Sequence, residues 1–201
     1  MGIAVSTWVI VLIKDFASAK QRLQPALGPK ERQALARRNA RLAVRAAAAG
    51  DHTLVVAGSE EVAKLAKGWS ADVLAEPRQE GQNVAAARGI ARAIEGGAEA
   101  VLLLSSDLPL VTVEAVRDVL DSASRLDGPV AVAVEAIGRG GTNALYLRPP
   151  TAMTLSFGAD SLAKFRHEAE TRGVNFVVHH SDAMALDLDE PGDLARLRRA
   201  V

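Results

Sequence analysis

Short apolar runs alternate with amphipathic stretches along the whole chain. Residues 8–13 form a continuous apolar run rich in β-branched side chains, which is typical of a strand buried on both faces of a parallel sheet. Similar runs predict strands at residues 53–57, 72–75, 100–104, 130–135, 143–147 and 176–179. The helical spacing of apolar residues predicts helices at 29–49, 60–67, 83–95, 112–124 and 159–172, and a last helix after Pro191.

Local signals support several of these boundaries. Pro29 stands in the first turn of the long helix and Gly50 at its end, and Thr112 is placed to cap the helix that follows it. Glycines at 138, 140 and 141 predict a hairpin-like turn between the fifth and sixth strands. The alternation predicts one α/β domain over residues 1–201, a three-layer α/β/α architecture with a mostly parallel, mixed sheet and right-handed crossovers.

Composition narrows the kind of partner. Of the 201 residues, 49% are apolar, which is enough for one sizeable core. The 24 Lys and Arg balance the 24 Asp and Glu, so no overall field draws the chain to nucleic acid or to a membrane, and we expect small-molecule partners. The sequence leaves a homo-oligomer open. The absence of Cys excludes disulfides and thiolate metal sites and fits a cytoplasmic protein.

Three aspartates stand where we expect strands to end. Asp107 follows the apolar run at 100–104, and Asp187 and Asp189 lie one residue apart before the last helix. In open α/β sheets, ligands collect at the carboxyl ends of strands near a switch in strand order. Because converging carboxylates repel one another unless a hard cation neutralises them, the pattern predicts a site for one or two Mg²⁺ ions that handles phosphates. The simpler alternatives are a turn residue at Asp107 and a helix cap at Asp189.

A basic loop follows the first strand. The string KDFASAKQRL places Lys14, Lys20 and Arg22 together, and such a loop is a natural place for a polyphosphate. It has neither the GxxxxGK[ST] spacing of a phosphate-binding loop nor GxGxxG. An ordinary solvated loop with surface charges is the alternative.

Small polar residues mark other element ends. The amides of Gln82 and Asn83 are candidates to contact a base or ribose, with helix capping by Asn83 as the alternative. Segments 140–143 and 157–161 combine glycines with hydroxyls and offer backbone N–H groups to an anion. The four histidines show no spacing typical of metal ligands or of a catalytic triad.

Taken in order, the strings KDFASAKQRL, SSDLPL, GGTNAL, FGADS and DLDEP resemble the 2-phospholactate and phosphoenolpyruvate guanylyltransferases of deazaflavin coenzyme biosynthesis. The resemblance spans nearly the whole chain. It implies a nucleotidyltransferase of the glycosyltransferase-A type, with a nucleotide-diphospho-sugar transferase-like fold. It also implies GTP as donor, and phosphoenolpyruvate, 2-phospho-L-lactate or 3-phosphoglycerate as acceptor. The basic string stands where broader sugar nucleotidyltransferases have a glycine-rich loop, and this favours the narrower family.

The resemblance further implies roles for particular residues. The metal-binding aspartates of the family match Asp107, Asp187 and Asp189. The positions that hold the acceptor's carboxylate and phosphate match Thr142, Gly158 and Ser161. The residues expected to face the donor triphosphate are Lys14, Lys20 and Arg22. Among these, we expect Asp107 and Lys20 to be catalytic.

Other functions stay open on the sequence alone. A sugar-phosphate or molybdopterin-type nucleotidyltransferase, or a nucleotide-sugar glycosyltransferase, would keep the same fold. A metal-dependent glycosyltransferase would need a mid-chain Asp-x-Asp, whereas the mid-chain string is SSDLP. A non-catalytic nucleotide-binding module would tolerate the loss of a metal aspartate or of the basic loop, and this chain has both.

Overall fold

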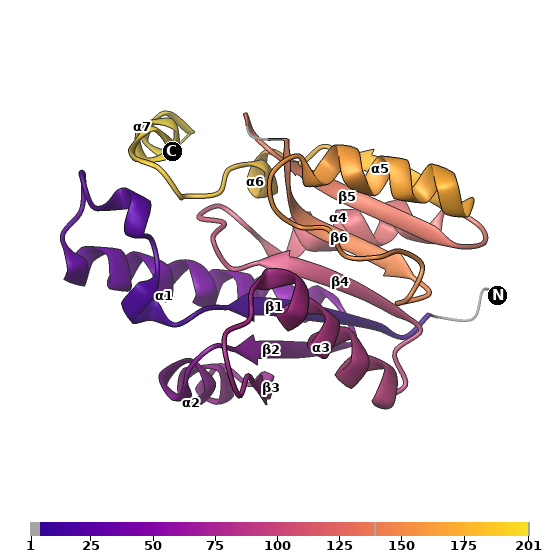
Figure 1. Cartoon of the computed structure of the whole chain (residues 1–201), viewed down its shortest axis with the longest axis horizontal. Coiled ribbons are helices and arrows are strands. Elements are labelled where there is room, and N and C mark those ends of the chain that lie inside the picture. The colour runs from indigo at the N-terminus through magenta and orange to yellow at the C-terminus, as the bar shows by residue number, and fades with distance from the viewer. Residues whose placement is uncertain (1–4, 139, 201) are drawn as a thin grey trace.

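A seven-stranded sheet in the order β3-β2-β1-β4-β6-β5-β7 forms the centre of the computed structural model, which describes residues 5–138 and 140–200 (Figure 1). The strands are β1 (Thr7–Ile13), β2 (His52–Ala57), β3 (Asp72–Ala75), β4 (Ala100–Ser105), β5 (Val130–Ala136), β6 (Gly141–Arg148) and β7 (Asn175–His179). Strand β6 runs antiparallel to β4 and β5, and the other pairs are parallel. The predicted mixed sheet and the pairing of the fifth and sixth strands are confirmed; Arg139, which falls between them in the sequence, lies outside the described residues.

Helices cover both faces of the sheet. They are α1 (Pro29–Ala46), α2 (Glu60–Gly68), α3 (Gln82–Glu95), α4 (Val113–Ser124), α5 (Ser161–Arg172), α6 (Asp182–Ala185) and α7 (Pro191–Ala200). Short 3₁₀ turns occur at Phe16–Ser18, Gln21–Leu23 and Ala47–Ala49, and the sequence predicted neither the first two of these nor α6. Thr112 caps α4 as predicted, with its Oγ1 accepting from the N–H of Ala115 at 3.1 Å. Over the described ranges, no helix has the length and apolar character needed to cross a membrane.

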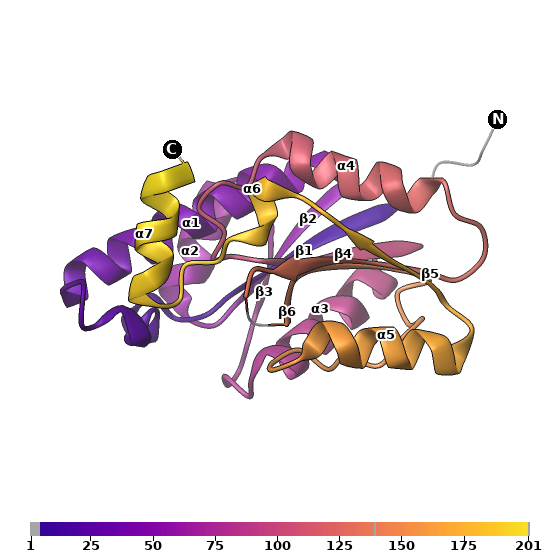
Figure 2. The ribbon, with the colours of Figure 1, turned by 90° about the horizontal axis from the view of Figure 1, so that it is seen from above.

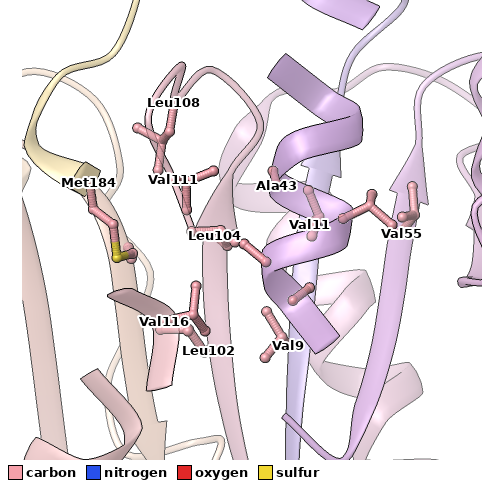
Figure 3. Packing of buried hydrophobic residues seen from close by; sticks show 14 of the residues in the cluster. Val9, Val11, Ala43, Val55, Leu102, Leu104, Leu108, Val111, Val116 and Met184 are labelled. Carbon is pink, nitrogen blue, oxygen red and sulfur yellow. The ribbon is translucent and has the colours of Figure 1, made fainter. Parts of the chain in front are cut away.

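Helices lie on both sides of the sheet (Figure 2), and the period-two alternation of the strands divides the core into two layers. Val9 and Val11 of β1 pack with α1 and α4 on one face, as Figure 3 shows for part of this cluster. Trp8 and Ile10 of the same strand belong to the cluster under α3 and α5 on the other face. Because burying one such side chain contributes about 1.5–3 kcal/mol, the continuous apolar runs specify a sheet covered on both sides.

Gly89 brings α3 close to the sheet. A Cβ at this position would lie 2.8 Å from Cγ2 of Ile10 and 2.9 Å from Cγ2 of Val56, which is closer than carbon atoms pack. The close approach fixes the height of α3 above the sheet.

The direction of the chain across the sheet reverses at β1. From β1 it moves outward through β2 and β3, and then returns to β4 on the other side of β1. Ligands of open α/β sheets bind outside the carboxyl ends of the strands at such a switch point. We therefore expect a ligand-binding site at this edge of the sheet.

Candidate active site

A pocket of about 690 Å³ lies at the carboxyl ends of β1 and β4. The basic loop after β1, the segment around the start of α3, and the turn after β4 line one part of it. The start of β6 and the residues before α5 line another. Of the residues predicted to form the site, all but Asn83 line this one pocket: Lys14, Lys20, Arg22, Gln82, Asp107, Thr142, Gly158, Ser161, Asp187 and Asp189.

The basic loop has a defined shape. Asp15 accepts a hydrogen bond from the N–H of Ala17 at 3.3 Å and begins the first 3₁₀ turn, and the ring of Phe16 is buried beneath it. Lys20 then adopts the left-handed conformation with φ of 59°, an unusual geometry for a residue with a Cβ. This turn points the Lys20 side chain inward, whereas Lys14 and Arg22 stay exposed at the pocket.

Lys20 is the buried cation of the site. Its Nζ lies 2.6 Å from Oδ1 of Asp107 and donates to the carbonyl of Leu188 at 2.5 Å. The Lys20 side chain is 2% exposed, whereas that of Asp107 is 44% exposed. The ammonium therefore neutralises a carboxylate that still faces the pocket.

The turn that carries Asp107 is held from two distant segments. The backbone carbonyl of Asp107 accepts hydrogen bonds from Nδ2 of Asn39 in α1 at 3.3 Å and from the N–H of Leu188 at 3.1 Å. Asn39 is fully buried, and sequence reasoning missed it. The available signal was an amide side chain inside the helical pattern predicted for residues 29–49.

The prediction that Asp187 and Asp189 stand at a strand end is wrong. Strand β7 ends at His179, α6 follows, and residues 186–189 form an irregular segment between α6 and α7. Hydrogen bonds from the Asn143 amide to the carbonyls of Met184 and Ala185, at 2.9 and 3.1 Å, hold the end of α6, just before this segment, against β6. Tertiary contacts, not a strand, therefore bring these aspartates to the pocket.

The Asp189 end of this segment is fixed by two further contacts. Arg22 donates to Oδ2 of Asp189 at 2.8 Å. Asp193, 2% exposed, accepts at Oδ2 from the N–H groups of Asp189 and Glu190 at 3.0 and 2.8 Å. Asp193 thereby caps the start of α7 and fixes the backbone beside Asp189, a role that the sequence analysis missed.

The three aspartates line one pocket without forming a closed metal cage. Within residues 5–138 and 140–200, no group of three or more His, Cys, Asp or Glu is arranged to hold a metal ion. Lys20 and Arg22 contact Asp107 and Asp189, so positive charge already stands beside these two carboxylates. The described residues therefore supply carboxylate donors for Mg²⁺ but not a complete site, as is usual where one or two carboxylates bind the ion together with substrate phosphates.

Another part of the pocket lining presents two hydroxyls and irregular backbone. Ser161, fully buried at the start of α5, donates through Oγ to Oγ1 of Thr142 at 3.0 Å. Because Thr142 accepts this bond, its own hydroxyl proton is left to donate elsewhere. Gly158 has φ of 127°, a conformation that side chains rarely adopt, and nothing lies within 4 Å of where its Cβ would be. This wall suits a small anion.

The wall beside α3 is built from residues 76–82. Arg88 of α3 contacts Glu80, donates to Glu76 at 3.2 Å and donates to the carbonyl of Arg78 at 3.2 Å. The hydrogen bond that Arg88 donates to Glu80, followed by its contacts with Glu76, raises the pKa of the Arg88 guanidinium above its usual value. Gln82 is the first residue of α3 and lines the pocket, whereas the Asn83 amide hydrogen-bonds to the backbone of Phe157.

The family model described as guanylyl transferase CofC like matches residues 7–198 of the chain. Among curated proteins, the phosphoenolpyruvate guanylyltransferase of Rubrobacter xylanophilus is 40% identical over 96% of this chain and 94% of its own. That of Conexibacter woesei is 35% identical over 98% and 89%. The 3-phospho-D-glycerate guanylyltransferase of Phenylobacterium zucineum is 33% identical over 94% and 88%.

Solved structures share the fold at lower identity. A Desulfovibrio desulfuricans protein described as a nucleotide-diphospho-sugar transferase superposes with a TM-score of 0.75 at 20% identity, covering 98% of this chain and 87% of its own. A Mycobacterium tuberculosis protein in complex with manganese superposes with a TM-score of 0.58 at 17% identity, covering 98% and 100%. The predicted nucleotidyltransferase-like α/β fold is confirmed.

Proposed function

Because the chain belongs to the guanylyl transferase CofC-like family, we propose that it transfers GMP from GTP to the phosphate of a small phosphorylated carboxylic acid and releases pyrophosphate. The acceptors that its relatives are named for are phosphoenolpyruvate, 2-phospho-L-lactate and 3-phospho-D-glycerate. We place the reaction in deazaflavin coenzyme biosynthesis and in the cytoplasm, where GTP and phosphorylated acids are found.

The observation that carries this proposal is the division of the pocket. Cationic and carboxylate side chains stand on the side of the basic loop, as a triphosphate and a divalent cation need. The paired hydroxyls of Thr142 and Ser161, with the backbone around Gly158, line another part of the same pocket, as a small phosphorylated acid needs. This distribution of side chains supports separate subsites for two anionic substrates within one pocket.

The reaction requires a phosphate oxygen of the acceptor to attack the α-phosphorus of GTP. A new P–O bond forms, and the bond from the α-phosphorus to the bridging oxygen breaks as pyrophosphate leaves. The nucleophile is already an anion near neutral pH, so no general base is needed. This agrees with a pocket lined by no histidine among the described residues. Rate enhancement then depends on positioning and on charge neutralisation.

We assign the chain's own residues to these two tasks. Lys14 and Arg22 neutralise the triphosphate from the exposed part of the basic loop. Lys20 adds a positive charge from its buried position in the same loop. Thr142 and Ser161 orient the acceptor. Mg²⁺ held by Asp107, Asp187 and Asp189 would supply further neutralisation of the phosphates, and the manganese-bound structure of the same fold supports a divalent cation.

The first experiment is pyrophosphate release from GTP and Mg²⁺ with each of the three acceptors, beside an EDTA control. We expect release with one acceptor and its loss in EDTA. Release that is unchanged by EDTA would refute the metal assignment. Tight GTP binding without release from any acceptor would refute the reaction.

A further inference from the structure

The Asn83 amide joins two parts of the chain that line the pocket. Its Oδ1 accepts from the N–H of Phe157 at 2.8 Å, and its Nδ2 donates to the carbonyl of the same residue at 3.2 Å. The two residues are 74 positions apart in the sequence. Both the oxygen and the nitrogen of the Asn83 amide therefore bond to the backbone of one residue, Phe157, in a distant loop.

This pair of bonds does not serve helix capping. Asn83 is the second residue of α3, whose N-cap is Gly81 and which has no side-chain cap. An asparagine near a helix start ordinarily bonds to local backbone N–H groups. Here the amide crosses to another element, so its contribution is to tertiary placement.

Phe157, the residue that Asn83 holds, lies beside the pocket residues to which we assign acceptor binding. Phe157, Gly158 and Ala159 line the pocket, and Ser161 begins α5 two residues further on. We define residues 154–160 as the acceptor loop. Its backbone contains φ values of 127° at Gly158 and 54° at Asp160, so local preference does not fix its path.

Other contacts hold the ends of the acceptor loop. At its start, the N–H of Thr154 donates to Glu168 at 3.2 Å. Just past its end, the N–H of Leu162 donates to the carbonyl of Gly140 at 3.1 Å. Between these points the Phe157 ring packs edge-to-face on Phe165, with ring centroids 5.2 Å apart. The Asn83 amide therefore connects the middle of the acceptor loop, next to Gly158, to the start of α3. The first residue of α3, Gln82, lines the pocket.

We propose that Asn83 is a positioning residue that holds the acceptor loop in its binding geometry and thereby sets the affinity for the phosphorylated acid. The inference rests on the proposed function for the identity of the ligand. Asn83 acts through Phe157 and contacts neither substrate. This differs from the role of base or ribose contact that the sequence suggested.

The expected effect on the acceptor KM depends on the fraction of the protein in which the acceptor loop is held in its binding geometry. Two hydrogen bonds of ordinary net strength correspond to about a 5- to 30-fold change in an equilibrium. An apparent dissociation constant rises in inverse proportion to the fraction of binding-competent protein. For Asn83→Ala we expect the KM of the acceptor to rise about 5- to 30-fold. The kcat at saturating acceptor and the KM of GTP should change by less than about threefold, because bound acceptor restores the loop.

A matched control separates this effect from general destabilisation. Asn175 also donates from Nδ2 to a backbone carbonyl, that of Asp127 at 2.7 Å, at the opposite end of the sheet. Asn175→Ala removes a comparable bond and should leave every kinetic constant unchanged. Asn83→Asp keeps an acceptor for the Phe157 N–H but loses the donor, and should give an intermediate rise in acceptor KM if Asn83→Ala does not fold.

Hydrogen exchange provides a readout that does not require turnover. In Asn83→Ala, peptides covering residues 154–160 should exchange faster than in the wild type, while peptides from β1 and β4 keep their protection. Unchanged exchange in these peptides, or a rise in GTP KM with an unchanged acceptor KM, would overturn the inference. If the wild-type protein turned over none of the three acceptors, the proposed function would fail, and exchange would still decide whether Asn83 holds the loop.

Discussion

Asp107→Ala should lower stability and turnover by separable routes. In the wild type, the buried Lys20 ammonium lies 2.6 Å from the Asp107 carboxylate. The substitution leaves a charge in a 2% exposed position and removes its carboxylate partner. It also removes one of the carboxylates proposed to hold Mg²⁺.

The exposure of the pair sets the size of the stability effect. Breaking a fully buried ion pair destabilises by about 3–5 kcal/mol, whereas an exposed pair contributes about 0.2–1 kcal/mol. Because Lys20 is buried and the Asp107 side chain is 44% exposed, we expect about 1–3 kcal/mol. For a chain of this length, that lowers Tm by about 2–12 °C. Turnover should fall about 100-fold or more, as loss of a metal clamp does.

The double variant Lys20→Met/Asp107→Ala distinguishes the two routes. Methionine keeps an apolar stem and removes the unpaired charge, so Tm should rise again relative to Asp107→Ala, while turnover stays low. Thermal melts and pyrophosphate release with the best acceptor measure the two quantities. Near-normal turnover in folded Asp107→Ala would refute the metal assignment. A double variant no more stable than the single variant would refute the buried-charge argument.

Three further changes test other parts of the structure. Ser161→Ala removes the donor to Thr142 and should raise acceptor KM about 5-fold with little effect on GTP KM; an effect confined to GTP would contradict the assignment of this wall. Hydrogen bonds from the side chain and then the backbone of Thr154 lower the pKa of Glu168 below its usual value of 4.5, with Arg172 adding to the effect. The Glu168 carboxylate therefore stabilises the fold above pH 4.5 and loses this contribution as the pH falls through the lowered pKa. The difference in Tm between the wild type and Glu168→Gln should accordingly disappear in acid. A Tm difference that does not depend on pH would contradict this argument. Gly89→Val should destabilise by about 1–3 kcal/mol or more in denaturant titration, since its Cβ would overlap Ile10, and unchanged stability would show that α3 moves freely.

Much of the fold was predictable from local pattern. The apolar runs located all seven strands within a residue or two, because burial on both faces leaves a signal that needs no knowledge of the partner. Thr112 as a cap and Asp107 after β4 followed from turn and capping chemistry, which acts over three or four residues. The order of the strings also indicated the family before any geometry was known.

Only the tertiary structure decided how the site residues are used. Lys20 contacts Leu188, which is 168 residues away, and Asn83 contacts Phe157 across 74 residues. Asp187 and Asp189 reach the pocket on an irregular segment, so the pattern of strands could not place them. Periodicity reports whether a residue is buried and in which element, because these depend on near neighbours in the sequence. Which polar groups meet depends on strand order and loop path, and these are set by the packing of the whole chain.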